Sequence, residues 1–240
     1  MDKRLARQVV EIGRALYEKG LVAGAEGNIS VRLSADTILI TPSGKNKGAL
    51  TEDDLVVVDL SGNVLAGKHR VSSEYRLHAV IYRERDDVGA VVHAHPPTAT
   101  ALTVAGLTMM DPVLPEIVVT LGGVPTVPFA VPGTEALAEA VRPYLADFDA
   151  LLLENHGAVT MGPDLERAHQ KMESLEMAAH IRWIARTLGA ERQLTRDEVA
   201  ALLAARAFAP ATSGRHPGKK LLKWLEDRKD GCKPGDSATK

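Results

Sequence analysis

Four side chains of the sequence, Glu74, His93, His95 and His156, are of the types that bind a divalent metal ion. His93 and His95 follow residues 89–92, an apolar and β-branched run that is typical of a buried strand, and two prolines end this strand. Side chains at positions i and i+2 of a strand point to the same face, roughly 6.5 to 7 Å apart. Both imidazoles therefore face one space, at a separation that suits two ligands of one ion.

His156 repeats this pattern at a second strand. Residues 150–153 are apolar and predict a buried strand, and residues 154–157 form the turn expected at its end. A histidine pair is also found as hydrogen-bonded polar residues at the rim of a sheet, so His93 and His95 alone leave that alternative open. With His156 added, the sequence predicts one metal site shared by the three histidines.

Three polar turns could receive an anion, namely Gly27-Asn28, Ser43-Gly44 and Ser72-Ser73. Each places small residues where backbone N–H groups can approach a ligand, and Ser72-Ser73 also begins a predicted helix, whose N-terminus favours negative charge. Ordinary turn and capping chemistry explains any one of these turns by itself. Glu74 directly follows Ser72-Ser73, so a phosphate held there would leave this carboxylate in the first helical turn, close to the rest of the ligand.

Helical and strand patterns alternate along the chain. Apolar residues three and four apart predict helices, and short apolar runs predict strands. Residues 20–30 are expected to form a loop, and the last helix is expected to begin with a capping box at Thr195. Strands are predicted at 31–33, 37–41, 55–60, 89–92, 124–129 and 150–153, and helices at 1–20, from 73, 96–105, 133–145, 163–187 and 195–206. This alternation predicts an α/β fold, an α/β/α sandwich in which helices cover both faces of a central, mainly antiparallel sheet.

The chain is predicted to form one domain, residues 1–208, followed by a C-terminal extension, residues 209–240. The extension holds several Pro, Gly, Ser and Lys residues and is expected to be mobile, apart from a short helix around residues 221–225. The apolar stripe of this helix needs a partner surface. It packs on its own subunit or a neighbouring one, or it helps to close an active site.

Composition is that of a soluble enzyme. Of the 240 residues, 45% are hydrophobic and 25% charged, enough to bury one core, and a formal net charge of -2 gives no field that draws nucleic acid or an anionic membrane. Residues 1–20 have an amphipathic pattern rather than that of a signal peptide, and no apolar run reaches the length of a membrane span. Cys232 is the single cysteine and has no partner for an internal disulfide, so the expected location is the cytoplasm.

In its motifs the chain resembles the class II aldolase and adducin family, and within it the enzymes that cleave L-fuculose 1-phosphate. The resemblance runs from about Ala6 to about Leu203 and is strong because many motifs share order and spacing. These motifs are Gly27-Asn28-Ile29-Ser30, Thr41-Pro42-Ser43-Gly44, Ser72-Ser73-Glu74, His93-Ala94-His95-Pro96, Pro132-Gly133-Thr134 and Asn155-His156-Gly157.

The resemblance implies a metal-dependent lyase. Zn²⁺ is the implied ion, with Mn²⁺ or Co²⁺ as alternatives, and Glu74 is the implied catalytic acid/base that also reaches the metal in the free enzyme. The implied metal ligands are Glu74, His93, His95 and His156, and the implied substrate-phosphate site consists of Gly27, Asn28, Ser43, Gly44, Ser72 and Ser73. Family members cleave a ketose 1-phosphate, through a metal-stabilised enediolate, to dihydroxyacetone phosphate and a small aldehyde such as lactaldehyde. The same resemblance implies a homotetramer with sites at subunit boundaries.

One part of the family pattern is absent. A tyrosine from the neighbouring subunit supplies the proton of the departing alkoxide in the fuculose phosphate enzymes, but the matching region here is Leu114-Pro115-Glu116-Ile117. A C-terminal tyrosine is missing too, since the last tyrosine is Tyr144. Glu116 is therefore a candidate for the proton-donor role, and a purely structural carboxylate is the alternative.

Other activities of the same fold remain open. Dehydration of methylthioribulose 1-phosphate uses a glutamate in the region of Glu116, and decarboxylation of a phosphorylated sugar acid is compatible with the same motifs. Epimerisation of ribulose 5-phosphate is disfavoured, because it uses aspartate in place of Glu74 and a late tyrosine. An adducin-like binding module would need no metal ligands, whereas this chain has the complete set.

Overall fold

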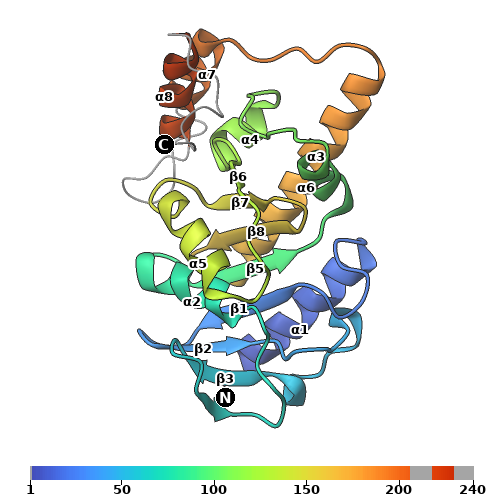
Figure 1. The fold of residues 1–240 in the computed structure, drawn as a ribbon, viewed down its shortest axis with the longest axis vertical. Coiled ribbons are helices and arrows are strands. Elements are labelled where there is room, and N and C mark those ends of the chain that lie inside the picture. The colour runs from blue at the N-terminus through green and yellow to red at the C-terminus, as the bar shows by residue number, and fades with distance from the viewer. Residues whose placement is uncertain (1, 206–217, 230–240) are drawn as a thin grey trace.

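The computed structural model describes residues 2–205 and 218–229. Its centre is an eight-stranded sheet in the order β4-β3-β2-β1-β5-β8-β7-β6 (Figure 1). Neighbouring strands pair antiparallel, except that β6 and β7 are parallel. The strands are β1 (Asn28–Arg32), β2 (Thr37–Ile40), β3 (Val56–Asp59), β4 (Val64–Ala66), β5 (Ala90–Ala94), β6 (Thr126–Val127), β7 (Ala150–Leu153) and β8 (Gly157–Gly162).

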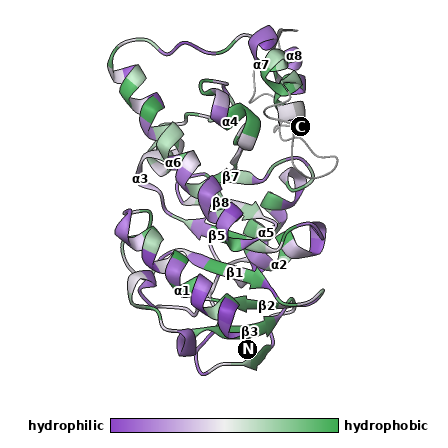
Figure 2. Cartoon of the chain, turned by 180° about the vertical axis from the view of Figure 1, so that it is seen from behind, coloured by the Kyte–Doolittle hydropathy of each residue, from purple (hydrophilic) through white to green (hydrophobic). Residues whose placement is uncertain are grey.

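Helices cover both faces of this sheet. One face packs against α1 (Lys3–Glu18), α3 (Pro97–Val104) and α6 (Leu165–Thr187), and the opposite face packs against α2 (Tyr75–Glu84) and α5 (Glu135–Val141). Figure 2, seen from behind, places α1 and α6 in front of the strands. The predicted α/β/α sandwich with a mainly antiparallel sheet is thus confirmed. The remaining elements are α4 (Pro115–Thr120), α7 (Arg196–Ala204), α8 (Gly218–Lys229) and the short 3₁₀ turns η1 (Lys47–Ala49), η2 (Glu52–Asp54) and η3 (Arg142–Tyr144).

Alternation along the strands divides the core into two layers. Val92 of β5 belongs to the cluster with α1 and α6, whereas Val91 belongs to the cluster with α2 and α5. Successive side chains of a strand point to opposite faces, so both faces of a central strand such as β5 must be apolar. By the same alternation, His93 points to the α2 side of the sheet.

Several boundaries differ from the prediction. Residues 28–30 lie in β1 rather than in a loop, because Asn28 and Ser30 pair with β5 and place their polar side chains under α2. The predicted strand 124–129 shrinks to Thr126–Val127 between Pro125 and Pro128, which lack the N–H that a ladder requires. Likewise, α5 ends at Val141, two residues before Pro143.

The start of α2 is also shifted. Tyr75 begins the helix, so Glu74 is its N-cap and does not lie in the first turn as predicted. The Thr195 capping box of α7 is present as predicted, with Glu198 as its second member.

α8 packs on its own subunit. Leu221 is fully buried in the cluster on the α2 side, Lys220 forms an ion pair of 2.6 Å with Asp147, and Glu226 one of 2.6 Å with Arg196. Most of the remaining extension, including Cys232, lies outside the described residues, and the domain boundary at residue 208 stays a prediction. Within residues 2–205 and 218–229, every helix is too short or too polar to cross a bilayer.

A buried ion-pair cluster attaches the end of α6 to two connecting segments. The Arg182 side chain is 3% exposed and donates to Asp111 at 3.1 Å and to Glu191 at 2.6 Å. It also donates to the carbonyl oxygen of Thr108. Arg186, which is 40% exposed, contacts the other oxygen of Glu191 at 2.5 Å.

We expect Arg182→Met to lower the free energy of unfolding by about 3–5 kcal/mol, because it removes the positive charge that two buried carboxylates share. The matched change Arg186→Met, at an exposed position of the same cluster, should cost less than about 1 kcal/mol. Urea denaturation at one protein concentration measures both. Equal losses in the two variants would contradict the prediction.

Candidate active site

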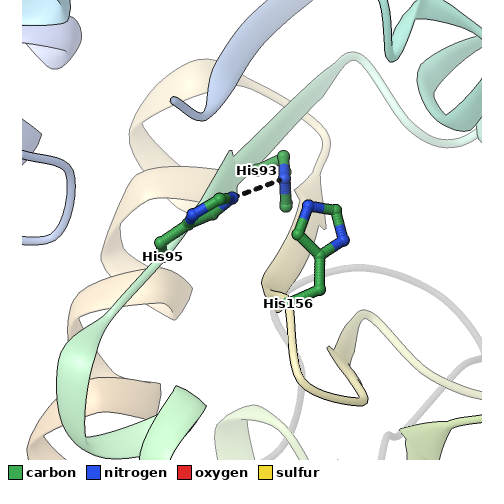
Figure 3. Close-up of side chains that lie close together, drawn as sticks. All are labelled: His93, His95 and His156. Carbon is green, nitrogen blue, oxygen red and sulfur yellow. Dashed lines mark hydrogen bonds between the residues drawn. The ribbon is translucent and has the colours of Figure 1, made fainter. Parts of the chain in front are cut away.

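Three histidine side chains meet at the end of the central strands. His93 belongs to β5, His95 follows that strand by one residue, and His156 lies in the turn between β7 and β8. Their ligand nitrogens all lie within 4.8 Å of one another. The ring centroids are 4.8 to 5.1 Å apart, and the rings meet edge to face around a common point (Figure 3).

Strand pairing fixes this arrangement. Ala94 of β5 is paired with Ala158 of β8, which brings the turn with His156 beside the end of β5. His93 donates from Nδ1 to the carbonyl oxygen of Ala158 at 2.9 Å, so its Nε2 faces the other two rings. Gly157 leaves space for this approach, because a Cβ there would lie 2.5 Å from the carbonyl oxygen of Ala94.

The carboxylate of Glu74 closes the cluster from the α2 side. Its Oε2 lies 3.2 Å from Nε2 of His93 and accepts a hydrogen bond of 2.9 Å from Nδ2 of Asn28. Its Oε1 lies 3.3 Å from Nε2 of His156. Asn28 is placed there because β1 pairs Asn28 with His93 of β5. The structure thus brings Glu74 and the three predicted histidines together, and their role as ligands stays a prediction.

Burial and mutual contact set the charges of the cluster. Burial by itself would raise the pKa of Glu74, but the charge of His93 and hydrogen bonds from His93 and Asn28 hold that pKa well below its usual range. Burial, together with the charge of His93, lowers the pKa of His95 and of His156 to about 4. His95 and His156 are therefore neutral at pH 7, as metal ligation requires.

The donor set fits a divalent ion. Nε2 of His93 and Nε2 of His95 lie 3.3 Å apart and face each other. In a neutral histidine that binds a metal, the ring nitrogen that faces the ion carries no proton. Two such nitrogens so close together are therefore placed as ligands of one ion. Oε1 of Glu74 is buried and has no hydrogen-bond partner among the described residues. Three imidazoles and one carboxylate oxygen form the tetrahedral type of set that zinc takes in proteins.

Two of the predicted anion-binding turns lie together beside Glu74. An isolated bridge joins Pro42 to Val71, and the N–H of Ser43 donates to the carbonyl oxygen of Arg70 at 3.0 Å. The exposed residues of this pair of turns are Ser43, Gly44 and Ser73, whereas Ser72 is 5% exposed and accepts from the N–H of Glu74 at 3.3 Å. Loops 43–44 and 72–73 therefore present neighbouring backbone next to the carboxylate.

Gly27 and Asn28 complete this edge of the site. Gly27 has φ of +72°, and a Cβ there would lie 2.8 Å from the carbonyl oxygen of His93. Asn28 is 3% exposed and follows directly in β1. Gly27 and Asn28 thus border the histidine cluster directly, turns 43–44 and 72–73 lie on the side of Glu74, and contact of these residues with a phosphate stays a prediction.

Lys47 is a buried cation that no sequence pattern singled out. It is 1% exposed, and its Nζ donates to the carbonyl oxygens of Ala25 at 2.7 Å and Lys45 at 2.8 Å. Burial lowers its pKa to about 8, against the opposing charges of Glu26 and Glu74. The ammonium therefore ties the loop before Gly27 to the loop after Gly44.

Glu176 is a second residue that the sequence did not reveal. From α6 its carboxylate accepts from the N–H groups of Thr98 and Ala99, both at 2.8 Å, at the start of α3. The contact stabilises the N-terminus of α3 and so fixes the chain directly after His95. The sequence carries no local sign of this role, because Glu176 and Thr98 are 78 residues apart.

Glu116, the predicted proton donor, lies elsewhere. It is an exposed residue in the first turn of α4, a helix that packs against α7 and α8. Within the described part of this single subunit, its carboxylate has no hydrogen bond or ion pair to the histidine cluster. Its proton-donor role stays a prediction that requires a neighbouring subunit.

Comparison with known proteins identifies the family. The model of the class II aldolase and adducin N-terminal domain matches residues 7–183. The chain is 38% identical over 181 residues to L-fuculose phosphate aldolase of Methanocaldococcus jannaschii, covering 75% of this chain and 95% of the relative. It is 36% identical over 207 residues to 3-oxo-tetronate 4-phosphate decarboxylase of Pectobacterium atrosepticum, covering 84% and 93%.

Solved structures agree with this assignment. YgbL of Klebsiella pneumoniae, described as a candidate aldolase, epimerase or decarboxylase, superposes with a TM-score of 0.78 at 35% identity and covers 84% of this chain and 99% of its own. The matched region contains Glu74 and all three histidines of the cluster. The chain therefore belongs to the class II aldolase and adducin family and is a lyase.

Proposed function

We propose that this enzyme cleaves a ketose 1-phosphate, similar to L-fuculose 1-phosphate, between C3 and C4 into dihydroxyacetone phosphate and a small aldehyde such as lactaldehyde. One observation carries the proposal: the Glu74 carboxylate lies 3.2 Å and 3.3 Å from two histidines of the cluster and directly follows the 72–73 turn. A metal-binding group and an anion-binding group therefore meet at one acid/base side chain. The relatives named L-fuculose phosphate aldolase support the substrate class.

His93, His95 and His156 hold the divalent ion, for which zinc fits the donor set and Mn²⁺ or Co²⁺ are alternatives. When bound, the ion acts as a Lewis acid that polarises the C2 carbonyl and stabilises the negative charge left by cleavage. The substrate phosphate lies against Gly27, Asn28, Ser43, Gly44, Ser72 and Ser73.

Glu74 transfers the proton at C3. In the free enzyme its carboxylate is held by Asn28 and by His93. Once the substrate oxygens take its place beside the histidines, the side chain takes up a proton from solvent and gives it to C3 in the cleavage direction. In the direction of synthesis, the carboxylate removes this proton from dihydroxyacetone phosphate.

Release of an aldehyde requires a second group, because the C4 hydroxyl must give up its proton when the C3–C4 bond breaks. We assign this role to Glu116, which accepts the proton in cleavage and donates it to the aldehyde oxygen in synthesis, acting on the site of a neighbouring subunit in the expected homotetramer. Its exposure on α4 is compatible with such a contact.

Decarboxylation is the second candidate, because a relative of 36% identity is named 3-oxo-tetronate 4-phosphate decarboxylase. Loss of CO₂ from a 3-oxo acid leaves the same carbanion next to a carbonyl, and a proton on that carbon again gives dihydroxyacetone phosphate. CO₂ departs without any proton transfer of its own. The missing family tyrosine would then have no consequence.

Direct assay separates these reactions. The metal-loaded enzyme is incubated with L-fuculose 1-phosphate, a 5-deoxypentulose 1-phosphate, methylthioribulose 1-phosphate and 3-oxo-tetronate 4-phosphate. We expect dihydroxyacetone phosphate together with an aldehyde from one of the first two sugars. Release of CO₂ from the fourth compound alone would replace the aldolase with a decarboxylase, and loss of water from the third would indicate a dehydratase.

Removal of one imidazole should abolish metal binding. We expect about one divalent ion per wild-type chain by elemental analysis, and a background level in His93→Ala, since three ligands are needed for a tight site. His180→Ala, an exposed histidine of α6, should retain the ion and the activity. Full activity of a metal-free preparation would refute the site.

Glu74→Gln should keep the metal but lower proton exchange at C3 of dihydroxyacetone phosphate by about 10²-fold or more, because the amide cannot accept that proton. Deuterium uptake from D₂O, followed by NMR, measures the exchange. Glu116→Gln is the matched control and should leave exchange unaltered while slowing aldehyde release. Unchanged exchange in Glu74→Gln would remove Glu74 from the role.

Lys47→Met should weaken phosphate binding, since the ammonium joins the two loops that border the anion. In the wild type, the pKa of about 8 means that Lys47 is charged below pH 8 and neutral above it, so KM should rise as pH increases through 8. The variant should have a KM about tenfold higher at pH 7, with little change up to pH 9.

Lys45→Met is the control for this effect. Lys45 is a neighbouring cation that is paired with Asp54 at 2.9 Å and is 42% exposed. The Lys45→Met variant should retain the rise of KM above pH 8. The same rise in Lys47→Met would contradict the assignment of the pH dependence to Lys47.

A further inference from the structure

A buried line of polar side chains runs from α2 through β1 to Glu74. Tyr82 and His78 lie one turn apart on α2, and Ser30 and Asn28 lie at alternate positions of β1. The hydroxyls of Tyr82 and Ser30 are 2.8 Å apart, Ser30 is 2.6 Å from Nδ1 of His78, and Nε2 of His78 contacts Oδ1 of Asn28. Asn28 then donates to Glu74 at 2.9 Å.

The whole line is shielded from solvent. His78 and Ser30 are 0% exposed, Tyr82 is 1% exposed and Asn28 3%. Burial of a polar group to this extent destabilises the fold unless the group has a hydrogen-bond partner, so every donor in the line must face an acceptor. This requirement determines where the protons lie.

The order of donors follows from the carboxylate end. An ionised carboxylate only accepts, so the NH₂ group of Asn28 faces Glu74 and its carbonyl oxygen faces His78. Nε2 of His78 must then carry a proton. Burial lowers the pKa of His78 to about 3, so the ring is neutral and Nδ1 accepts from Ser30. The Ser30 oxygen in turn accepts from the hydroxyl of Tyr82.

We propose that His78 is a positioning residue, which through this line holds the Asn28 amide with its NH₂ group toward the site. A rotated amide would present its oxygen to the Glu74 carboxylate, and the Nε2–H donor of His78 opposes that rotation. The oriented NH₂ group then serves two acceptors in turn, first Glu74 and then the substrate phosphate after the carboxylate moves. This second acceptor rests on the proposed function.

The geometry also separates His78 from metal binding. The ring of His78 hydrogen bonds with Ser30 and Asn28, and the histidine cluster consists of His93, His95 and His156. Loss of the His78 donor should therefore change anion binding without changing metal content. If His78 served only in packing, its loss should lower stability and leave anion binding unchanged.

The first test is the tautomer of His78 in the zinc-loaded protein, observed by ¹⁵N NMR of labelled histidine. We expect the Nε2–H form with Nδ1 as acceptor, whether or not any sugar phosphate is turned over. A ring protonated at Nδ1 alone would overturn the proposal, because it has no donor for Asn28.

The second test is calorimetric titration of zinc-loaded variants with inorganic phosphate. His78→Met removes the donor at similar volume and should raise the Kd about tenfold or more, with zinc content unchanged. His78→Gln restores an N–H toward Asn28 and should stay within about threefold of the wild type. Tyr82→Phe removes a buried hydrogen bond of the same line two links away, so it should lower Tm but leave the Kd near the wild-type value.

Wild-type phosphate affinity in His78→Met would overturn the proposal, as would an equal loss in Tyr82→Phe. The outcome is distinguishable from failure of the proposed function. If none of the sugar phosphates is cleaved, but the tautomer and the variant affinities are as expected, the positioning role stands and the assigned reaction falls.

Discussion

A carboxylate that is nearly removed from water is the constraint on which the site depends. Glu74 is 8% exposed, and a buried charge is tolerated only where opposite charge and hydrogen bonds replace its hydration. His93 and Asn28 fill that role, and each is held in turn, His93 by a carbonyl oxygen of β8 and Asn28 by His78 of α2. Four elements must therefore be in register at once, since a slip of β1 by one residue would turn Asn28 to the other face of the sheet.

The local parts of this arrangement were predictable, whereas the long-range parts were not. Apolar spacing indicated the layers of the fold, and positions i and i+2 of a strand placed His93 and His95 together. The beginning of β1 escaped prediction, because Asn28 and Ser30 are polar residues typical of turns. Their reason for lying in a strand is a set of partners 46 to 52 residues away. Burial of Lys47 has the same origin, since its partner Ala25 is 22 residues away in another loop.

The site combines parts of different rigidity. The clustered histidines lie at or next to the ends of central strands that are covered on both faces, whereas the proposed anion-binding residues, apart from Asn28 of β1, lie in turns, two of which are exposed. Lys47 and the bridge between Pro42 and Val71 restrain those turns from behind. Glu116, the group proposed to act on the leaving part of the substrate, lies by contrast on a short peripheral helix. In the proposed reaction, the residues that handle the carbanion thus lie in the core, and the residue that handles the leaving group lies at the periphery.

Two glycines, Gly27 and Gly157, border the histidine cluster where neighbouring segments approach most closely. At Gly27 and Gly157 the neighbouring atoms are main-chain carbonyl oxygens, 2.8 Å and 2.5 Å from where a Cβ would be. Both oxygens belong to β5, and side-chain atoms of Val22 at 2.9 Å and of His95 at 2.8 Å lie almost as near, so these glycines let two neighbouring segments lie directly against the end of the histidine strand. A side chain at either position would push the segment with Asn28 or the turn with His156 away from β5. The spacing of the histidine cluster is in this way set by the absence of two side chains as much as by the imidazoles themselves.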